Sequence, residues 1–172
     1  APKSDDKKIV LNEFKHPALK NPKSISLDFN GQVLMITGVN AGGKTMLLKS
    51  IISAVFLAKY LIPLPINASK SSIASFKFIH LILEDPQNSK NDISTFGGRM
   101  LQFSQILSQR EGIIGVDEIE LGTDSDEAAS LFKVLLENLI AKNNKIIITT
   151  HHKRLAALMA GNPKVQLLAA LF

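Results

Sequence analysis

Eight consecutive residues in the first third of the chain have the types and spacing of a phosphate-binding loop. They match the pattern G-x-x-x-x-G-K-[ST], with an apolar run of strand character before them and a long helical pattern after them. Phosphate oxygens need several inward-pointing N–H donors at a helix N-terminus, and glycines let the backbone approach that closely. The eight residues are Gly38, Val39, Asn40, Ala41, Gly42, Gly43, Lys44 and Thr45.

Two side chains of this loop are expected to act on the phosphates of ATP, and ADP is expected to bind at the same place. Lys44 should reach the β- and γ-phosphates, and the hydroxyl of Thr45 should ligate Mg²⁺. The alternative is a glycine-rich turn that contains Lys-Thr by chance. The flanking strand and helix favour the phosphate-binding interpretation, because context is what confirms this motif.

Two acidic residues follow a second apolar run, about seventy residues after the loop. The buried strand expected at 112–117 ends in Asp117, and Glu118 comes next. We expect Asp117 to hold Mg²⁺ through water and Glu118 to orient or deprotonate the attacking water. The alternative is a strand end with solvated acids, which the preceding loop disfavours because both halves of one magnesium site are then present.

A third apolar run, expected as a strand at 145–150, ends in two histidines. We take His151 as the candidate sensor of the γ-phosphate and as a catalytic residue beside Glu118 and Lys44. The alternatives are a cap on the next helix or a two-histidine metal site. Adjacent residues on a strand point to opposite faces, which disfavours the metal site.

Elements that alternate in type must position these residues. The chain predicts an α/β fold, with a mostly parallel sheet flanked by helices in a single domain (1–172) whose leading strands (1–31) precede a core (32–172). Strands are expected at 8–11, 24–29, 32–37, 78–83, 112–117, 145–150 and 164–172, helices at 43–60, 99–108 and 125–141, and a polar loop at 84–92.

Two of the expected helices have distinct patterns of apolar residues. The helix at 43–60 is apolar on most faces, Met46 and Phe56 included, and is expected to be buried. The helix at 125–141 is amphipathic, with Asp124 or Ser125 as its N-cap. Its inward residues are expected to be Ala128, Leu131, Phe132, Leu135 and Leu139.

Composition excludes several classes of protein. The 172 residues include no cysteine, which excludes a disulfide scaffold and a Cys-based zinc site and fits a cytoplasmic location. The N-terminus has no signal-peptide pattern, and the longest apolar stretch, 51–64, is too short to span a bilayer, so no membrane partner is expected. The net charge of +5 permits contact with a polyanion, but the lysines are scattered. Both ends of the chain look cut from a longer protein.

These segments, taken in order, resemble the ATPase domain of the MutS family within the wider ABC class. The resemblance covers nearly the whole chain. It includes His16-Pro17-Ala18-Leu19, the phosphate-binding loop, Ile93–Met100, the Asp-Glu strand end with Gly122-Thr123-Asp124, and Thr149-Thr150-His151. Thr45-Met46 after the loop lysine makes the chain most similar to the second bacterial branch of the family, MutS-two.

The resemblance implies a homodimeric ATPase with two nucleotides at the subunit interface. In that arrangement Ser94 of one subunit contacts the γ-phosphate bound by the other; from the sequence alone, Ser94 would be an ordinary start of a capped helix. The resemblance also implies action on branched or recombination DNA, through regions outside these 172 residues, and a C-terminal Smr nuclease domain outside them. No nuclease activity is expected from this part.

Departures from the family pattern leave two other functions open. Val39 replaces a usual proline, Gly97-Gly98-Arg99 is richer in glycine than usual, and Glu120-Leu121 stands where the family has a glycine and a small or basic residue. One alternative is a nucleotide-gated dimerisation module with negligible hydrolysis. The other is the nucleotide-binding domain of an ABC transporter, against which the chain lacks Leu-Ser-Gly-Gly-Gln and has Ile119 in place of proline.

Overall fold

The computed structural model describes residues 7–38, 41–83, 92–118, 126–151 and 153–169. The strands are β1 (Ile9–Phe14), β2 (Ile25–Phe29), β3 (Val33–Thr37), β4 (Ser72–Ile73), β5 (Ile79–Ile82), β6 (Ile113–Val116), β7 (Lys145–Thr149) and β8 (Val165–Ala169). The helices are α1 (Ala41–Lys59), α2 (Asp92–Ile106), α3 (Asp126–Ala141), α4 (Lys153–Ala160) and the short 3₁₀ helix η2 (Ala68–Lys70).

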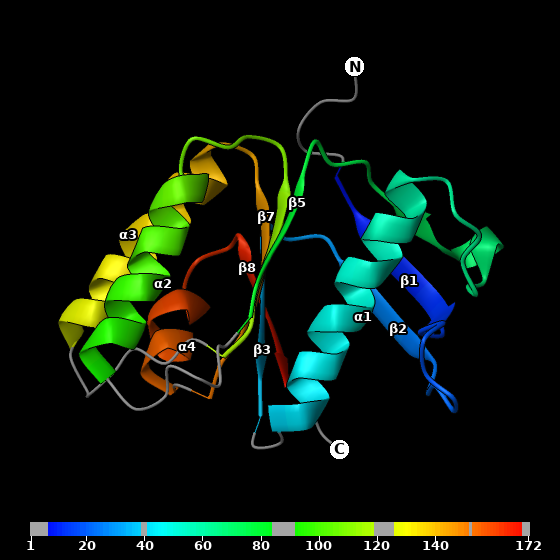
Figure 1. Ribbon diagram of the computed structural model, residues 1–172, viewed down its shortest axis with the longest axis horizontal. Helices are drawn as coiled ribbons and strands as arrows, with labels where there is room; N and C mark the ends of the chain where they lie inside the picture. Colours follow the sequence, from blue (N-terminus) through cyan, green and yellow to red (C-terminus); the bar gives the residue numbers. More distant parts are fainter. Residues whose placement is uncertain (1–6, 39–40, 84–91, 119–125, 152, 170–172) are drawn as a thin grey trace.

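The strands form two sheets. The larger has five strands in the order β5-β6-β7-β3-β8, and every neighbouring pair is parallel. The smaller is antiparallel, in the order β2-β1-β4. The prediction of an α/β fold with a mostly parallel sheet is confirmed (Figure 1).

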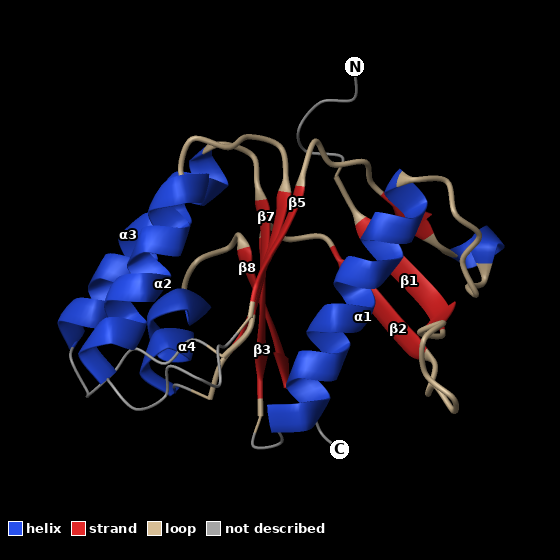
Figure 2. Ribbon diagram, viewed as in Figure 1, coloured by secondary structure: helices blue, strands red, loops and turns tan. Residues whose placement is uncertain are grey.

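Strict alternation along the central strands gives the large sheet two apolar faces. In β7, Ile146 and Ile148 face one core cluster while Ile147 faces the other, because successive strand side chains point to opposite faces. The first cluster lies under α2, α3 and α4, and the second under α1 and the small sheet. Figure 2 shows the resulting layers, with the large sheet between the helices on one side and α1 with β1 and β2 on the other.

Helix α1 differs from the fully buried helix that its composition suggests. One broad face packs on the large sheet through residues such as Leu48, Ile51 and Val55. Met46 is 40% exposed and Phe56 46% exposed, so the prediction that these two are buried is wrong. An apolar side chain is buried only where a neighbouring element covers it, and the described residues place none over this face.

The inward face of α3 is rotated slightly from the predicted one. Ala128, Phe132 and Leu139 are buried as expected and Leu135 packs partly buried against the core, but Leu131 is 46% exposed, so that assignment is wrong. The buried stripe continues instead through Ala129, Leu136 and Ile140, which keeps the 3.6-residue period. The two candidate N-caps, Asp124 and Ser125, lie outside the described residues.

Helix α2 begins seven residues earlier than predicted, at Asp92, so the prediction that Asp92 belongs to the polar loop is wrong. The rest of that loop, 84–91, lies outside the described residues, as does 170–172 at the end of the last predicted strand. Within the part of the chain that the structure describes, no helix combines the length and the apolar character needed to cross a bilayer.

Candidate nucleotide site

The predicted site residues follow three adjacent strands of the large sheet. Gly38 comes directly after β3, Asp117 directly after β6, and His151 two residues after the end of β7. Because β7 lies between β6 and β3 and all three are parallel, their carboxyl ends meet at one edge of the sheet. Helix α1 starts at this same edge (Figure 1).

The start of α1 holds the predicted loop lysine in a buried position. Gly38 has φ 147°, a backbone conformation that residues with a side chain rarely adopt. Its carbonyl accepts a hydrogen bond of 2.8 Å from Nζ of Lys44, whose side chain is 1% exposed. Ala41, Gly42 and Gly43 form the first residues of α1, whereas Val39 and Asn40 lie outside the described residues.

The buried Lys44 ammonium faces the carboxylate of Glu118. Nζ of Lys44 lies 3.3 Å from Oε1 of Glu118, and this oxygen forms no hydrogen bond with any described residue. The contact is therefore an ion pair without hydrogen-bond geometry. The attraction between the two charges offsets part of the free-energy cost of removing each of them from water, which is very high for an isolated charge.

Thr45 and Asp117 are also brought together. The Thr45 hydroxyl donates a hydrogen bond of 2.8 Å to Oδ1 of Asp117, which is buried. This hydrogen bond joins the two predicted magnesium ligands, which lie 72 positions apart in the sequence.

A hydroxyl that the sequence reasoning missed completes the group. Thr149, the last residue of β7, is fully buried and donates a second hydrogen bond of 2.8 Å to Oδ1 of Asp117. The only signal for it was a pair of threonines before His151, and threonine is common in strands for reasons of packing alone.

Glu118 is held by its backbone and its side chain. Its φ is 46°, in the left-handed region, and its N–H donates a hydrogen bond of 2.8 Å to Oγ1 of Thr149. Its Oε2 lies 3.0 Å from Nδ1 of His151, whose side chain is half exposed. The structure thus joins Lys44, Glu118 and His151 through one carboxylate.

Comparison with known proteins identifies the family of this chain. The model of MutS domain V matches residues 34–171. The chain belongs to the MutS family. The matched range contains every residue of the described cluster.

Relatives of this MutS domain include several bacterial proteins named endonuclease MutS2. The one from Helicobacter pylori strain 26695 is 62% identical over 171 residues, which are 99% of this chain and 22% of the relative. The one from Streptococcus equi subsp. equi strain 4047 is 39% identical over 159 residues, which are 90% of this chain and 20% of the relative. The chain therefore spans about a fifth of the length of these relatives.

The oxygen donors of this MutS domain fit a magnesium ion. The Thr45 hydroxyl and the Asp117 carboxylate are in contact and both are hard oxygen ligands, the kind that Mg²⁺ prefers. Protein sites for Mg²⁺ commonly use only one or two such groups and leave the remaining positions to water and phosphate oxygens. Ser94 lies in the first turn of α2, but its side chain is outside the described part of the structure, so its contact with a second nucleotide stays a prediction.

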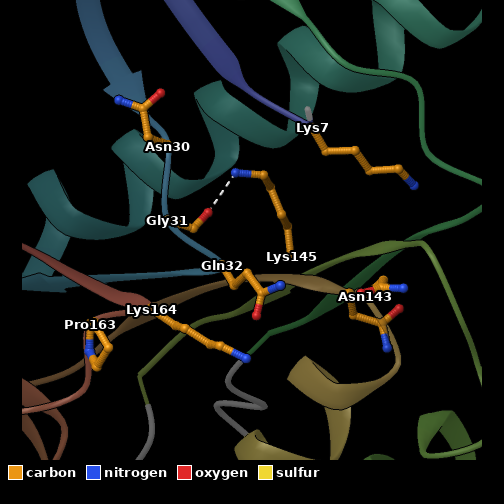
Figure 3. Close-up of a pocket in the computed structure, with 9 residues that line it drawn as sticks. Lys7, Asn30, Gly31, Gln32, Asn143, Lys145, Pro163 and Lys164 are labelled. Carbon is orange, nitrogen blue, oxygen red and sulfur yellow. Dashed lines mark hydrogen bonds between the residues drawn. The ribbon is translucent and has the colours of Figure 1, made fainter. Parts of the chain in front are cut away.

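A separate pocket of about 250 Å³ is lined mostly by polar residues and lies at the opposite edge of the large sheet, next to the starts of β3, β7 and β8. Figure 3 shows the residues that line it. Lys7, Lys145 and Lys164 contribute to its lining, and none of the predicted nucleotide-site residues does. The ammonium of Lys145 is already occupied, because it donates hydrogen bonds to the carbonyls of Phe29 (3.1 Å) and Gly31 (2.6 Å). This pocket is therefore best explained as a structural junction, distinct from the candidate nucleotide site.

Proposed function

We propose that this MutS domain binds ATP with Mg²⁺ and hydrolyses it. The observation that carries the proposal is the contact of the buried Lys44 with Glu118, together with the hydrogen bond from Thr45 to Asp117, at the start of α1. A cation, a hydroxyl and two carboxylates are the groups that phosphoryl transfer requires, because its catalysis consists mainly of positioning and charge stabilisation.

In this proposal each of these groups has its own role. Lys44 is held within the site and would contact the β- and γ-phosphates, exchanging its ion pair with Glu118 for the more highly charged ligand. Glu118 would then orient a water molecule and accept its proton as the water attacks the γ-phosphorus. Thr45 and Asp117 would hold Mg²⁺, whose charge neutralises the phosphate oxygens when it is bound.

His151 is suited to act through Glu118 and beside the γ-phosphate. Its Nδ1 contacts Oε2 of Glu118, and its side chain is half exposed. The contact supports the proposed sensor role, because one imidazole would touch both the general base and the terminal phosphate.

The wider function that we propose is to drive a DNA-processing homodimer. Support comes from the family and from relatives named endonuclease MutS2. In this proposal DNA is bound by regions outside these 172 residues, and Ser94 completes the site of the partner subunit. The match to MutS domain V favours this function over that of a transporter domain.

The first prediction tests hydrolysis at the proposed site. In the full-length protein, Lys44→Ala should lower the ATPase rate by about 100-fold or more, because it removes a buried cation aimed at the developing charge. Steady-state phosphate release at saturating MgATP measures the effect.

Lys49→Ala is the matched control, because Lys49 lies on the same helix with an exposed side chain. It should keep the wild-type rate. Equal turnover by the Lys44→Ala and wild-type proteins would overturn the proposed ATPase function.

A further inference from the structure

The hydroxyl of Thr149 joins the two acidic residues of the site. It lies at the end of β7, within 2.8 Å of both Oδ1 of Asp117 and the backbone nitrogen of Glu118. The side chain is fully buried. Neither the family match nor the sequence motifs assign a role to this residue.

The direction of both hydrogen bonds is fixed by chemistry. A backbone N–H can only donate, so Glu118 donates to Oγ1 of Thr149. The single hydroxyl proton of Thr149 is then directed to the carboxylate of Asp117, which can only accept while it is ionised. Thr149 therefore constrains a backbone amide and a side-chain carboxylate with one oxygen atom.

The amide that it holds belongs to an unusual backbone. The N–H of Asp117 donates to the carbonyl of Ile82 and so continues the pairing of β6 with β5. Glu118 then turns into the left-handed region at φ 46°, which is uncommon for a residue with a side chain. This turn directs the amide of Glu118 toward β7, where the Thr149 hydroxyl accepts its hydrogen bond.

This turn decides where the Glu118 carboxylate lies. From it the side chain reaches Lys44 with one oxygen and His151 with the other, at 3.3 Å and 3.0 Å. Without a hydrogen-bond acceptor at Thr149, the buried amide of Glu118 would lose its partner, and the backbone would move to find another. The general base would then leave its position.

We propose that Thr149 is a positioning residue that fixes the general base Glu118 and the magnesium ligand Asp117 relative to each other. The proposal rests on the proposed ATPase function. It assigns to β7 an active part in the site, in addition to the His151 that follows it.

The test removes the hydroxyl while keeping the shape of the side chain. In the full-length protein, Thr149→Val should lower kcat for ATP by on the order of tenfold to 100-fold, because small displacements of a catalytic group have effects of this size. KM for MgATP should change much less than kcat. Thr149→Ser, which keeps the hydroxyl and loses a methyl group, should restore most of kcat.

A packing control comes from the same strand. Ile148→Val removes one buried methylene from β7 without touching the hydroxyl, and should keep kcat. A wild-type kcat in Thr149→Val would overturn the proposal, as would an equal loss in the Val and Ser variants, which would indicate packing. Loss of turnover in Lys44→Ala would confirm that the ATPase activity depends on the proposed site. A failure of the positioning proposal can therefore be distinguished from a failure of the proposed ATPase function.

A second measurement needs no turnover. Hydrogen exchange of the peptide that contains Asp117 and Glu118 should be slow in the wild type and in Thr149→Ser. In Thr149→Val the Glu118 amide should exchange at least about tenfold faster, because its acceptor is gone. Equal exchange in all three proteins would overturn the positioning role even if the ATPase function itself failed.

Discussion

Glu118 contacts three other residues of the candidate site. Its two oxygens face Lys44 and His151, and its amide is held by Thr149. Glu118 is buried, yet one of its oxygens has an ion pair and no hydrogen bond to a described residue. A carboxylate held in this way can accept a proton from a water molecule, which is the step that distinguishes hydrolysis from binding.

The residue-scale prediction is that Glu118→Gln abolishes hydrolysis and keeps binding. Turnover should fall by about 100-fold or more, because the amide cannot accept the proton of the attacking water. ATP should still bind, since Lys44 and Thr45 are unchanged, and the ATP-bound protein should accumulate as a dimer in sedimentation velocity experiments.

Glu137→Gln on the exposed face of α3 is the control and should behave as the wild type. Wild-type turnover in Glu118→Gln would show that Glu118 is not the base. Turnover that is absent even in the wild-type protein, with an ATP-dependent dimer, would favour the nucleotide-gated module over the ATPase.

At the scale of elements, close packing around the central strands is needed to hold the site residues in position. Gly112, just before β6, is buried, and a Cβ built there would overlap the ring of Phe78. Its N–H donates a hydrogen bond of 3.0 Å to Oδ1 of Asn144, which fixes the start of β6 beside the start of β7.

We therefore expect Gly112→Ala to destabilise the fold. The free energy of unfolding should fall by about 1–3 kcal/mol, the usual cost of an overpacked interior site. Urea denaturation measures it. Gly161→Ala serves as the control, because nothing lies within 4 Å of a Cβ at Gly161, and it should change stability by no more than about 0.5 kcal/mol. Equal stability of the two variants would contradict the close packing.

The strands and the motif residues could be predicted from the sequence because short-range patterns determine them. Alternating and continuous apolar runs located the central strands, and glycine, lysine and acids in fixed order located the site. Leu131 and Phe56 were misplaced because burial depends on which elements pack nearby, which no local pattern contains. Thr149 was missed because its role requires β7 to lie between β3 and β6, and that order is a property of the sheet.

At the scale of the whole molecule, a buried lysine joins the two sheets. Lys145, at the start of β7, donates to carbonyls at the end of β2 and in the turn before β3, and its ammonium lies 3.9 Å from the centre of the Phe29 ring. Burial lowers the pKa of Lys145 to about 8, although the nearby Asp28 carboxylate acts in the opposite direction.

This lowered pKa predicts a dependence of stability on alkaline pH. Between about pH 8 and pH 10.5 the unfolded chain holds a proton on Lys145 that the folded chain has lost, so the contribution of Lys145 to stability should rise with pH across that range. Below about pH 8 both states are protonated and the contribution should be constant. Denaturation of the wild type and of Lys145→Met, compared from pH 7 to pH 10.5, isolates this effect.

Lys164→Met, on the rim of the same pocket, is the control and should keep the pH dependence of the wild type. A constant difference in unfolding free energy between the wild type and Lys145→Met over the whole range would show that Lys145 does not change its proton affinity on folding.

The position of β7 between β3 and β6 has a consequence for how the protein is made. On the ribosome, the Gly38–Thr45 segment and the Asp117-Glu118 pair both emerge before residues 145–149. Strands β3 and β6 do not pair with each other, so nothing in the sheet brings these earlier segments together until β7 inserts between them. A nascent chain that ends before Thr149 carries the phosphate-binding loop and the Asp117-Glu118 pair, but it lacks the Thr149 hydroxyl, His151 and the strand that pairs with both β3 and β6.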